Sequence, residues 1–498
     1  MTRKRLFIFV GILALALVLR CLFLEKRGIT YDDAFSILLS RQSLGNIISG
    51  TAADTMPPLY YFLLHFWMRA GSSLWYVRLL SVCLSMAVLM LLHRLTVETL
   101  NEVAALWAMF LAAISPFQIY HAQELRMYSL LALGLLGYTL FFMRIWKAYQ
   151  VGRVPSREWF GLVICGTLSM YTHNLAVFSL AASFFVVLVH RKWKLLGQLA
   201  LAGLVILVLF SPWLFYVPEQ VEKIQRAFWT PRPGLVQVVQ AMMMFVVNLP
   251  LEGLALQVGA VISLQIIVLT VYLLLKKQGI KELPGVLSLL VILPPLCLFA
   301  VSYIMRPVFV VRGFILSTLL FYVLVAHVMM QDRVIRWIMV AGFLIASAFA
   351  LPFQYQYDRF PRSPFREAVA YLESVIEPGE VIIHDNKLSA FPAIYFAPDL
   401  PQVFIADELG SHNDTLALAS QQAMSLYPEP SVAAAAWGVE SLYFVSFDKA
   451  FQEYQQMGKA HPALSWLRQM YVQSDQVVIG DLVILHFSQP RLQGESGG

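Results

Sequence analysis

Charged residues are scarce in this chain of 498 amino acids. Only 13% of the residues are charged and 59% are hydrophobic, whereas soluble domains are about 25% charged and about 45–50% apolar. This composition excludes an ordinary soluble protein and predicts a polytopic membrane protein. The net charge of +6 is uneven, because residues 355–498 hold 8 basic and 17 acidic side chains and the rest of the chain holds 28 and 13. A basic excess between membrane helices is typical of cytoplasmic loops, so it gives no reason to expect nucleic-acid binding.

Cysteines are few, and no glycine-rich phosphate-binding loop is found. The four cysteines all lie in apolar runs, so the sequence predicts neither a disulfide framework nor a cysteine metal site. The chain begins MTRKR and continues into an apolar run, but no small-residue cleavage site follows. We therefore expect an uncleaved first span with a cytoplasmic N-terminus.

Long apolar runs are the dominant feature of the sequence. About eleven of them suit the roughly 30 Å hydrocarbon core of a bilayer. These segments are 6–24, 75–95, 103–119, 128–145, 159–172, 175–189, 195–216, 256–275, 284–305, 309–330 and 334–351.

The segment 57–70, PPLYYFLLHFWMRA, is ambiguous. As a helix it would be only about 21 Å long, and it carries His65 and Arg69. If this segment does not cross the membrane, four later loops that together hold 12 basic residues all lie on the cytoplasmic side, as the positive-inside rule requires. We therefore expect an amphipathic juxtamembrane helix in the outer interface. The four loops are 144–157, 191–194, 276–281 and 333–336.

The same parity predicts the domain organisation. Residues 1–352 would form the transmembrane domain, with an outer loop at 25–73. Residues 353–490 alternate helix-like and strand-like pieces, which predicts an extracytoplasmic α/β domain. The dipeptide Gly480-Asp481 favours a hairpin between its last two strands. The glycine-rich end, 491–498, is expected to be a disordered tail.

Two acidic sites fall on the predicted outer face. Asp32 and Asp33 lie in YDDAFS, and Glu124 lies within a turn of Arg126 and Tyr128 in HAQELRMY. Taken alone, the aspartates could equally be functional or purely structural, in a solvated loop or as the N-cap of a helix AFSILLSRQ. If the two acidic sites lie over one cleft, one carboxylate can act as a general base. The other can hold that base, a sugar hydroxyl or a metal ion in place. Asp32 and Glu124 are thus the candidates for binding a divalent cation, Mg²⁺ or Mn²⁺, although no cofactor is certain.

Cations are expected on the same face. They are Arg226, Arg306 and Arg312, and Arg312 lies about one turn into a span. An arginine inside hydrocarbon costs about 2.5–3.5 kcal/mol, so it usually has a partner. A phosphate held bidentately is the natural one, and snorkelling to lipid headgroups is the alternative. His173 in YTHNL would be either a phosphate donor or a capped helix end.

Four motifs in this order resemble the GT-C membrane glycosyltransferases. The motifs are YDDAFS, MPPLYYFLLHFW, WYVRLLS and SPFQIYHAQELRMYSLL. They are most similar to the branch of protein O-mannosyltransferases and lipid A aminoarabinose transferases, which includes bacterial relatives of glycosyltransferase family 39. The similarity is good over residues 5–213, diffuse to 351, and only architectural beyond.

The resemblance implies inverting transfer of a sugar from a polyprenyl-phosphate donor to an acceptor hydroxyl on a protein, lipid or glycan, at the outer face of the cytoplasmic membrane. It matches Asp32 to the base, Asp33 to its neighbour and Glu124 to the second acidic position. It also matches 57–70 to an interfacial helix, and more loosely the residues near Arg226 to a phosphate contact. The aminoarabinose branch has a lysine where this chain has Met56, which makes that substrate doubtful.

A lipid or sugar transporter, or flippase, with an outward-facing acidic ion site is the alternative. Transport sites lie near the bilayer midplane on broken helices within repeated halves, whereas these acids are predicted at the surface and no repeat is found. A scaffold whose C-terminal domain binds a partner would leave the paired acids unexplained. The enzyme is therefore the better interpretation.

Overall fold

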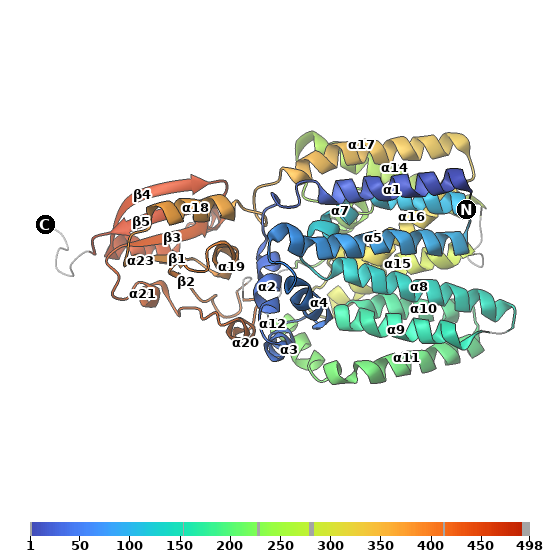
Figure 1. Cartoon of the computed structure of the whole chain (residues 1–498), viewed down its shortest axis with the longest axis horizontal. Coiled ribbons are helices and arrows are strands. Elements are labelled where there is room, and N and C mark those ends of the chain that lie inside the picture. The colour runs from blue at the N-terminus through green and yellow to red at the C-terminus, as the bar shows by residue number, and fades with distance from the viewer. Residues whose placement is uncertain (1, 153, 227–229, 278–282, 412–413, 491–498) are drawn as a thin grey trace. The chain divides into compact units, whose positions relative to one another are not determined.

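The computed structural model describes residues 2–152, 154–226, 230–277, 283–411 and 414–490, and the predicted tail 491–498 lies outside these. Its contacts divide the chain into two compact units (Figure 1). One unit contains Met1–Glu25 and Thr51–Tyr355, and the other contains Lys26–Gly50 and Gln356–Gly498. The segment Lys26–Gly50, which we expected as an outer loop of the transmembrane domain, thus makes its contacts mainly with the C-terminal domain.

Among its described residues the first unit contains helices and no strand. In it α5 packs on α6 and α8, α8 on α9, and α15 on α16. The helix α4 has ten residues, and it coincides with the segment expected to be too short for a span. The helices of this unit are α1 (Arg3–Cys21), α4 (Leu59–Met68), α5 (Leu74–Thr99), α6 (Glu102–Ile114), α7 (Pro116–Gln123), α8 (Tyr128–Gln150), α9 (Ser156–Thr172), α10 (Ala176–Val189), α11 (Trp193–Leu214), α12 (Val217–Arg226), α13 (Leu235–Met243), α14 (Gly253–Lys277), α15 (Leu283–Ile304), the 3₁₀ turn η1 (Val311–Phe314), α16 (Ile315–Met329) and α17 (Arg333–Tyr355). The helix α3 (Leu44–Ala53) crosses the boundary between the units.

All eleven segments predicted to span the membrane are helical, so a multi-pass helical membrane protein is confirmed. Over the described residues, seven helices are long and apolar enough to cross, or eight if the bent pair α6–α7 counts as one span. The helices α9 and α10 are shorter, with 17 and 14 residues, and α1 carries Arg20 besides three basic residues at its start. The number of eleven spans stays a prediction.

An ionic network joins α5, α8 and α9 at their predicted cytoplasmic ends. The Arg144 guanidinium lies 2.7 Å from a Glu98 oxygen and 3.5 Å from a Glu158 oxygen. Arg144 thus links Glu98 at the end of α5 to Glu158 in the first turn of α9. These charges lie where α8 ends, whereas Glu124 and Arg126 precede the start of α8.

The second unit contains a five-stranded sheet in the order β2-β1-β3-β5-β4. The first three of these strands are parallel, and β5 is antiparallel to both β3 and β4. The expected α/β domain is therefore confirmed. Its elements are α2 (Tyr31–Ser40), α18 (Phe365–Val375), β1 (Val381–His384), α19 (Lys387–Phe396), β2 (Gln402–Phe404), α20 (Leu418–Ala423), α21 (Val432–Ala435), β3 (Leu442–Phe447), α22 (Asp448–Gln456), α23 (Pro462–Met470), β4 (Val472–Ile479) and β5 (Leu482–Ser488).

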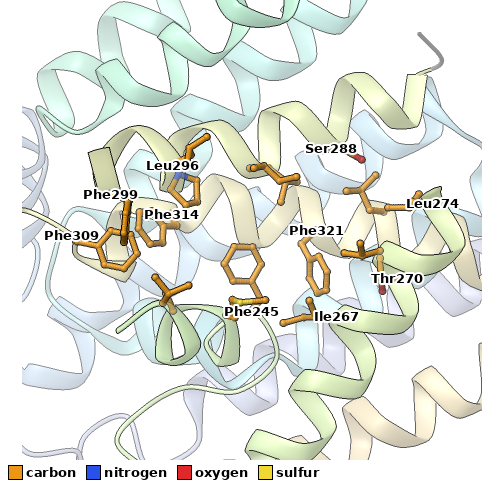
Figure 2. Close-up of a pocket in the computed structure, with 18 residues that line it drawn as sticks. Phe245, Ile267, Thr270, Leu274, Ser288, Leu296, Phe299, Phe309, Phe314 and Phe321 are labelled. Atoms are coloured by element: carbon orange, nitrogen blue, oxygen red, sulfur yellow. The ribbon is translucent and has the colours of Figure 1, made fainter. Parts of the chain in front are cut away.

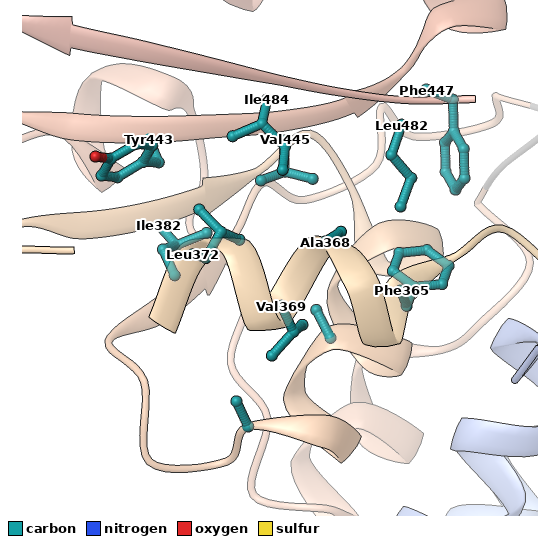
Figure 3. Packing of buried hydrophobic residues seen from close by; sticks show 12 residues of the cluster. Phe365, Ala368, Val369, Leu372, Ile382, Tyr443, Val445, Phe447, Leu482 and Ile484 are labelled. Atoms are coloured by element: carbon teal, nitrogen blue, oxygen red, sulfur yellow. The ribbon is translucent and has the colours of Figure 1, made fainter. Parts of the chain in front are cut away.

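Side chains of alternate strand residues form two cores, one on each face of this sheet. On one face Tyr443, Val445 and Ile484 pack against α18 through residues such as Phe365 and Leu372 (Figure 3). Their neighbours along the strands, such as Phe444 and Leu485, form the core on the other face. This period of two is what a sheet buried on both faces requires.

The predicted hairpin at Gly480-Asp481 is confirmed, because Ile479 pairs with Leu482 across the turn. Gly480 has a positive φ of 63°, and a Cβ there would lie 2.6 Å from the ring of Pro364. Only glycine fits this turn without strain.

Candidate functional site

A break between α6 and α7 positions the acidic residue of the helical unit. Pro116 stands at the first position of α7, and the Ser115 hydroxyl caps that helix by accepting from the Gln118 N–H at 3.3 Å. The two helices are bent by 60° relative to each other. The helix α7 ends at Gln123, so that Glu124, Arg126 and the start of α8 at Tyr128 follow within one short turn.

Glu124 is buried and paired with a histidine. Its Oε2 lies 2.9 Å from Nδ1 of His121, and both side chains are only 6% exposed. Its backbone carbonyl accepts a hydrogen bond from the Ser81 hydroxyl at 2.8 Å. His121 of α7 thus holds the carboxylate, and Ser81 of α5 holds the backbone of the same residue.

Tyr128 is the centre of a cluster of aromatic and cationic side chains. Its ring centroid lies 4.9 Å from that of His121 and 6.1 Å from that of His173. The guanidinium carbon of Arg312 lies 5.7 Å from the same ring, a cation–π arrangement. The structure therefore brings together four residues that the sequence analysis selected from different helices: Tyr128, His173, Arg312 and, through His121, Glu124.

Arg126 and His173 are both buried beside this cluster. Arg126 donates a hydrogen bond to the Tyr61 hydroxyl at 3.3 Å. Burial, together with the nearby charges of Arg312 and Arg126, lowers the pKa of His173 to about 3. Its Nδ1 accepts from the Leu175 N–H at 3.1 Å. His173 is therefore a neutral ring that accepts a hydrogen bond just before the start of α10 and carries its proton on Nε2.

The two aspartates lie in the other unit, at the start of α2, and they have different surroundings. Thr30 is the N-cap, its hydroxyl accepts from the Asp33 N–H at 3.0 Å, and its N–H donates to Asp33 Oδ2 at 3.2 Å. The expectation that an aspartate caps a helix beginning at Ala34 was wrong, because the helix begins at Tyr31 and its first turn includes both acids. Asp33 completes a capping box, whereas Asp32 is half-buried and lies outside that box.

The other two arginines lie at the end of α12. Arg226 is 75% exposed and pairs with Glu222 on the same helix. Arg306 donates hydrogen bonds to the carbonyls of Gln225 at 3.3 Å and Arg226 at 2.7 Å. These contacts fix the end of α12, and for Arg226 they place the side chain in solvent rather than beside Tyr128.

Sequence reasoning missed His121 and Tyr61. Of the two, only His121 could have been suspected from spacing, since it precedes Glu124 by three residues. Tyr61 comes from α4, and only the tertiary structure brings it to Arg126. Where the structure describes the chain, no three His, Cys, Asp or Glu side chains are grouped as a metal site.

A large apolar cavity is lined in part by the 3₁₀ turn that carries Arg312. Its volume is about 510 Å³, and its walls come from α13, α14, α15, α16 and η1. Phe309 and Phe314 line one end, and Ser288 and Leu274 line the other (Figure 2). Phe314 belongs to the same 3₁₀ turn as Arg312. Between Phe299 and Ser288 the cavity follows α15 for about 16 Å.

Comparisons with known proteins agree with the expected class. Residues 55–216 match the family model of dolichyl-phosphate-mannose-protein mannosyltransferases. No curated protein matches this chain in sequence.

Solved structures match over nearly the whole length. ArnT from Cupriavidus metallidurans in the apo state has a TM-score of 0.64 at 12% identity, over 96% of this chain and 97% of that one. ArnT bound to undecaprenyl phosphate gives 0.63, again at 12% identity, over 98% and 99%. The oligosaccharyltransferase of Archaeoglobus fulgidus, tethered to an acceptor peptide, gives 0.55 at 12% identity over 99% and 74%. The expected resemblance to GT-C membrane glycosyltransferases is confirmed, in sequence over residues 55–216 and in fold over nearly the whole chain.

Proposed function

We propose that this protein is an inverting glycosyltransferase that uses a polyprenyl-phosphate-linked sugar. The observation that carries the proposal is the buried cluster around Tyr128. In it His121, which pairs with Glu124, and Arg312 both contact the Tyr128 ring, and the turn that carries Arg312 also lines an apolar cavity. A negatively charged headgroup on a long hydrocarbon chain matches this combination of cations and apolar walls. The undecaprenyl phosphate bound by ArnT, a protein of the same fold, is such a molecule.

The donor phosphate is assigned to Arg312. Its guanidinium lies over the Tyr128 ring, and Arg312 follows the cavity residue Phe309 by three positions in the sequence. A donor whose phosphate is bound by Arg312 would therefore have its prenyl chain at the Phe309 end of the cavity. His173 can add an Nε2–H donor, and Arg126 adds a second positive charge. Arg306 and Arg226 are less suited, because they are engaged at the end of α12.

The base is assigned to Asp32 rather than Asp33, because Asp33 is already used in the capping box of α2. Asp32 would take the proton from the acceptor hydroxyl, whose oxygen forms a new bond to the anomeric carbon. The bond from that carbon to the phosphate oxygen breaks, and the electron pair leaves with the phosphate. Cations stabilise the charge that develops on the leaving group, which is usually the largest contribution to such catalysis. Glu124 would orient the sugar or the acceptor.

The reaction is placed on the outer face of the cytoplasmic membrane. The charge pattern supports this orientation, because the basic loops and the ionic network of Glu98 lie at the opposite helix ends from the cluster. The N-terminus would be cytoplasmic and the α/β domain extracytoplasmic. A divalent cation is not required by this scheme, since arginines can hold the phosphate.

Turnover of the donor tests the proposal. Purified protein in detergent, without an ion gradient, should release polyprenyl phosphate from one of a panel of radiolabelled polyprenyl-phosphate sugars when a cell-envelope extract supplies acceptors. Asp32→Asn should lower the rate by about 10² to 10⁴, as expected for loss of a general base, while donor binding survives. Glu98→Gln, matched in chemistry but at the other helix ends, should change the rate per folded protein less than about twofold. Gradient-dependent movement of an unchanged donor in vesicles would instead indicate a transporter.

A further inference from the structure

Arg20 is a buried arginine in α1 whose contacts lead to the break before α7. Its side chain is completely buried, although α1 is one of the predicted spans. A charge in that position usually has defined partners. Its Nε donates to the Ser85 hydroxyl at 2.9 Å, and its other donors reach only backbone carbonyls, Ala16 of its own helix among them.

The break between α6 and α7 leaves carbonyls that need donors. Pro116 has no N–H, so the carbonyl of Ala112, four residues earlier, loses its partner. The backbone at Ser115 is extended, so the carbonyls that follow Ala112 in α6 also lose their helical hydrogen bonds. In a membrane interior such carbonyls must be satisfied by other protein groups.

Arg20 supplies the missing donors. Its Nη1 donates to the carbonyl of Ala113 at 3.0 Å, and its Nη2 donates to that of Ala112 at 3.3 Å. The next carbonyl, that of Ile114, accepts from the Ser347 hydroxyl at 3.1 Å. A planar guanidinium can serve two neighbouring carbonyls at once, and its positive charge is favourable at the negative end of α6.

The same part of α1 also holds the far end of α7. The side-chain amide of Gln123 donates to the carbonyls of Arg20 at 3.0 Å and Leu22 at 2.9 Å. The end of α6 and the end of α7 are therefore both tied to the C-terminal end of α1, and the next residue after Gln123 is Glu124.

We propose that Arg20 is a positioning residue for Glu124, which it orients by fixing the angle and the end of α7. This inference rests on the proposed function, in that Glu124 is taken to act in sugar transfer. Arg20 itself contacts neither donor nor acceptor in this scheme. It sets the direction in which the carboxylate points.

Kinetics in two backgrounds test the inference. In otherwise unchanged protein, Arg20→Met should lower kcat for the donor that supports turnover by about 10- to 100-fold per folded molecule, with its KM within about twofold. In a Glu124→Gln background the same change should add less than a twofold loss, because a residue that acts through Glu124 has nothing left to position. Arg20→Lys should recover only part of kcat, since an ammonium lacks the fork. Equal losses in both backgrounds would overturn the proposal.

Two further variants keep the test decisive if Arg20→Met does not fold. Gln123→Leu removes the second tie and should show the same kcat loss and the same dependence on Glu124. Arg336→Met is the matched control, because Arg336 donates to the carbonyl of Met329 at the end of α16. It should leave kcat within about twofold, and an effect equal to that of Arg20→Met would refute a role specific to α7.

Hydrogen exchange separates this inference from the proposed function. In Arg20→Met or Gln123→Leu, the amides of residues 117–124 should exchange at least about tenfold faster than in the unchanged protein. Unchanged exchange would refute the positioning role whatever the enzyme does. If exchange is faster in these variants but Glu124→Gln is fully active, the role of Glu124 in sugar transfer is refuted. The structural link between α1 and α7 would still stand.

Discussion

Replacing Arg312 with methionine should weaken catalysis far more than it weakens the fold. In the folded protein the guanidinium has a cation–π contact with Tyr128, which contributes on the order of 1 kcal/mol. A hydrogen bond to a charged phosphate contributes about 1.5–3 kcal/mol. Since about 1.4 kcal/mol corresponds to a tenfold change, kcat/KM for the donor should fall about 10- to 150-fold.

No neighbour can replace the lost charge. Burial is the main reason that His173 stays neutral, with its pKa lowered to about 3, and the charges of Arg312 and Arg126 are secondary. Without Arg312 the pKa of His173 would rise, but burial would still keep the ring neutral near pH 7. Arg126 is also committed to Tyr61.

The assay is donor turnover at several donor concentrations, together with the melting temperature of each variant. Arg312→Lys should recover the charge but not the bidentate geometry, and therefore only part of the rate. Arg226→Met is the control, because Arg226 is exposed and paired with Glu222, so it should change kcat/KM less than about twofold. If Arg312→Met keeps normal kinetics while Arg226→Met loses them, the phosphate lies at α12 and our assignment is reversed.

Three further predictions concern topology, capping and pH. Cysteines at exposed Ser72 and Val151 should react differently in intact cells, with an impermeant thiol reagent labelling position 72 and not position 151; the opposite pattern would invert the predicted orientation. Asp33→Ala should lower stability by about 0.5–2 kcal/mol through loss of the capping box, measured as a lower melting temperature, whereas an unchanged melting temperature would contradict that role. Burial lowers the pKa of His384 to about 4, below the ordinary 6.5, so the unfolded chain binds the proton first and up to about 3 kcal/mol of stability is lost as pH falls from 6.5 to 4. The melting temperature of His384→Gln should depend less on pH over that interval than that of the unchanged protein. An equal dependence would contradict the role of His384.

The residues of the site were largely predictable, and their arrangement was not. Tyr128 and Glu124 lie in one short motif, so their proximity follows from the sequence. His173 and Arg312 are far away along the chain and meet Tyr128 only through packing of α8, α9 and η1. Arg226 has the same residue type as Arg312, yet the end of α12 leaves it in solvent.

The sequence by itself determined the class of the protein, because apolar runs of bilayer length and an α/β pattern of strand and helix periods are local properties. The break before α7 was not predicted, since residues 103–119 were expected to form one span. The local reason for it is Pro116, which cannot continue the hydrogen bonding of α6 and is well suited to the first position of a new helix. Only the tertiary structure decided that Arg20 would satisfy the carbonyls at that break and that segment 26–50 would group with the C-terminal domain. The physical reason is that helix formation and membrane insertion depend on neighbours along the chain, whereas buried donors are matched to acceptors by residues that are distant in sequence.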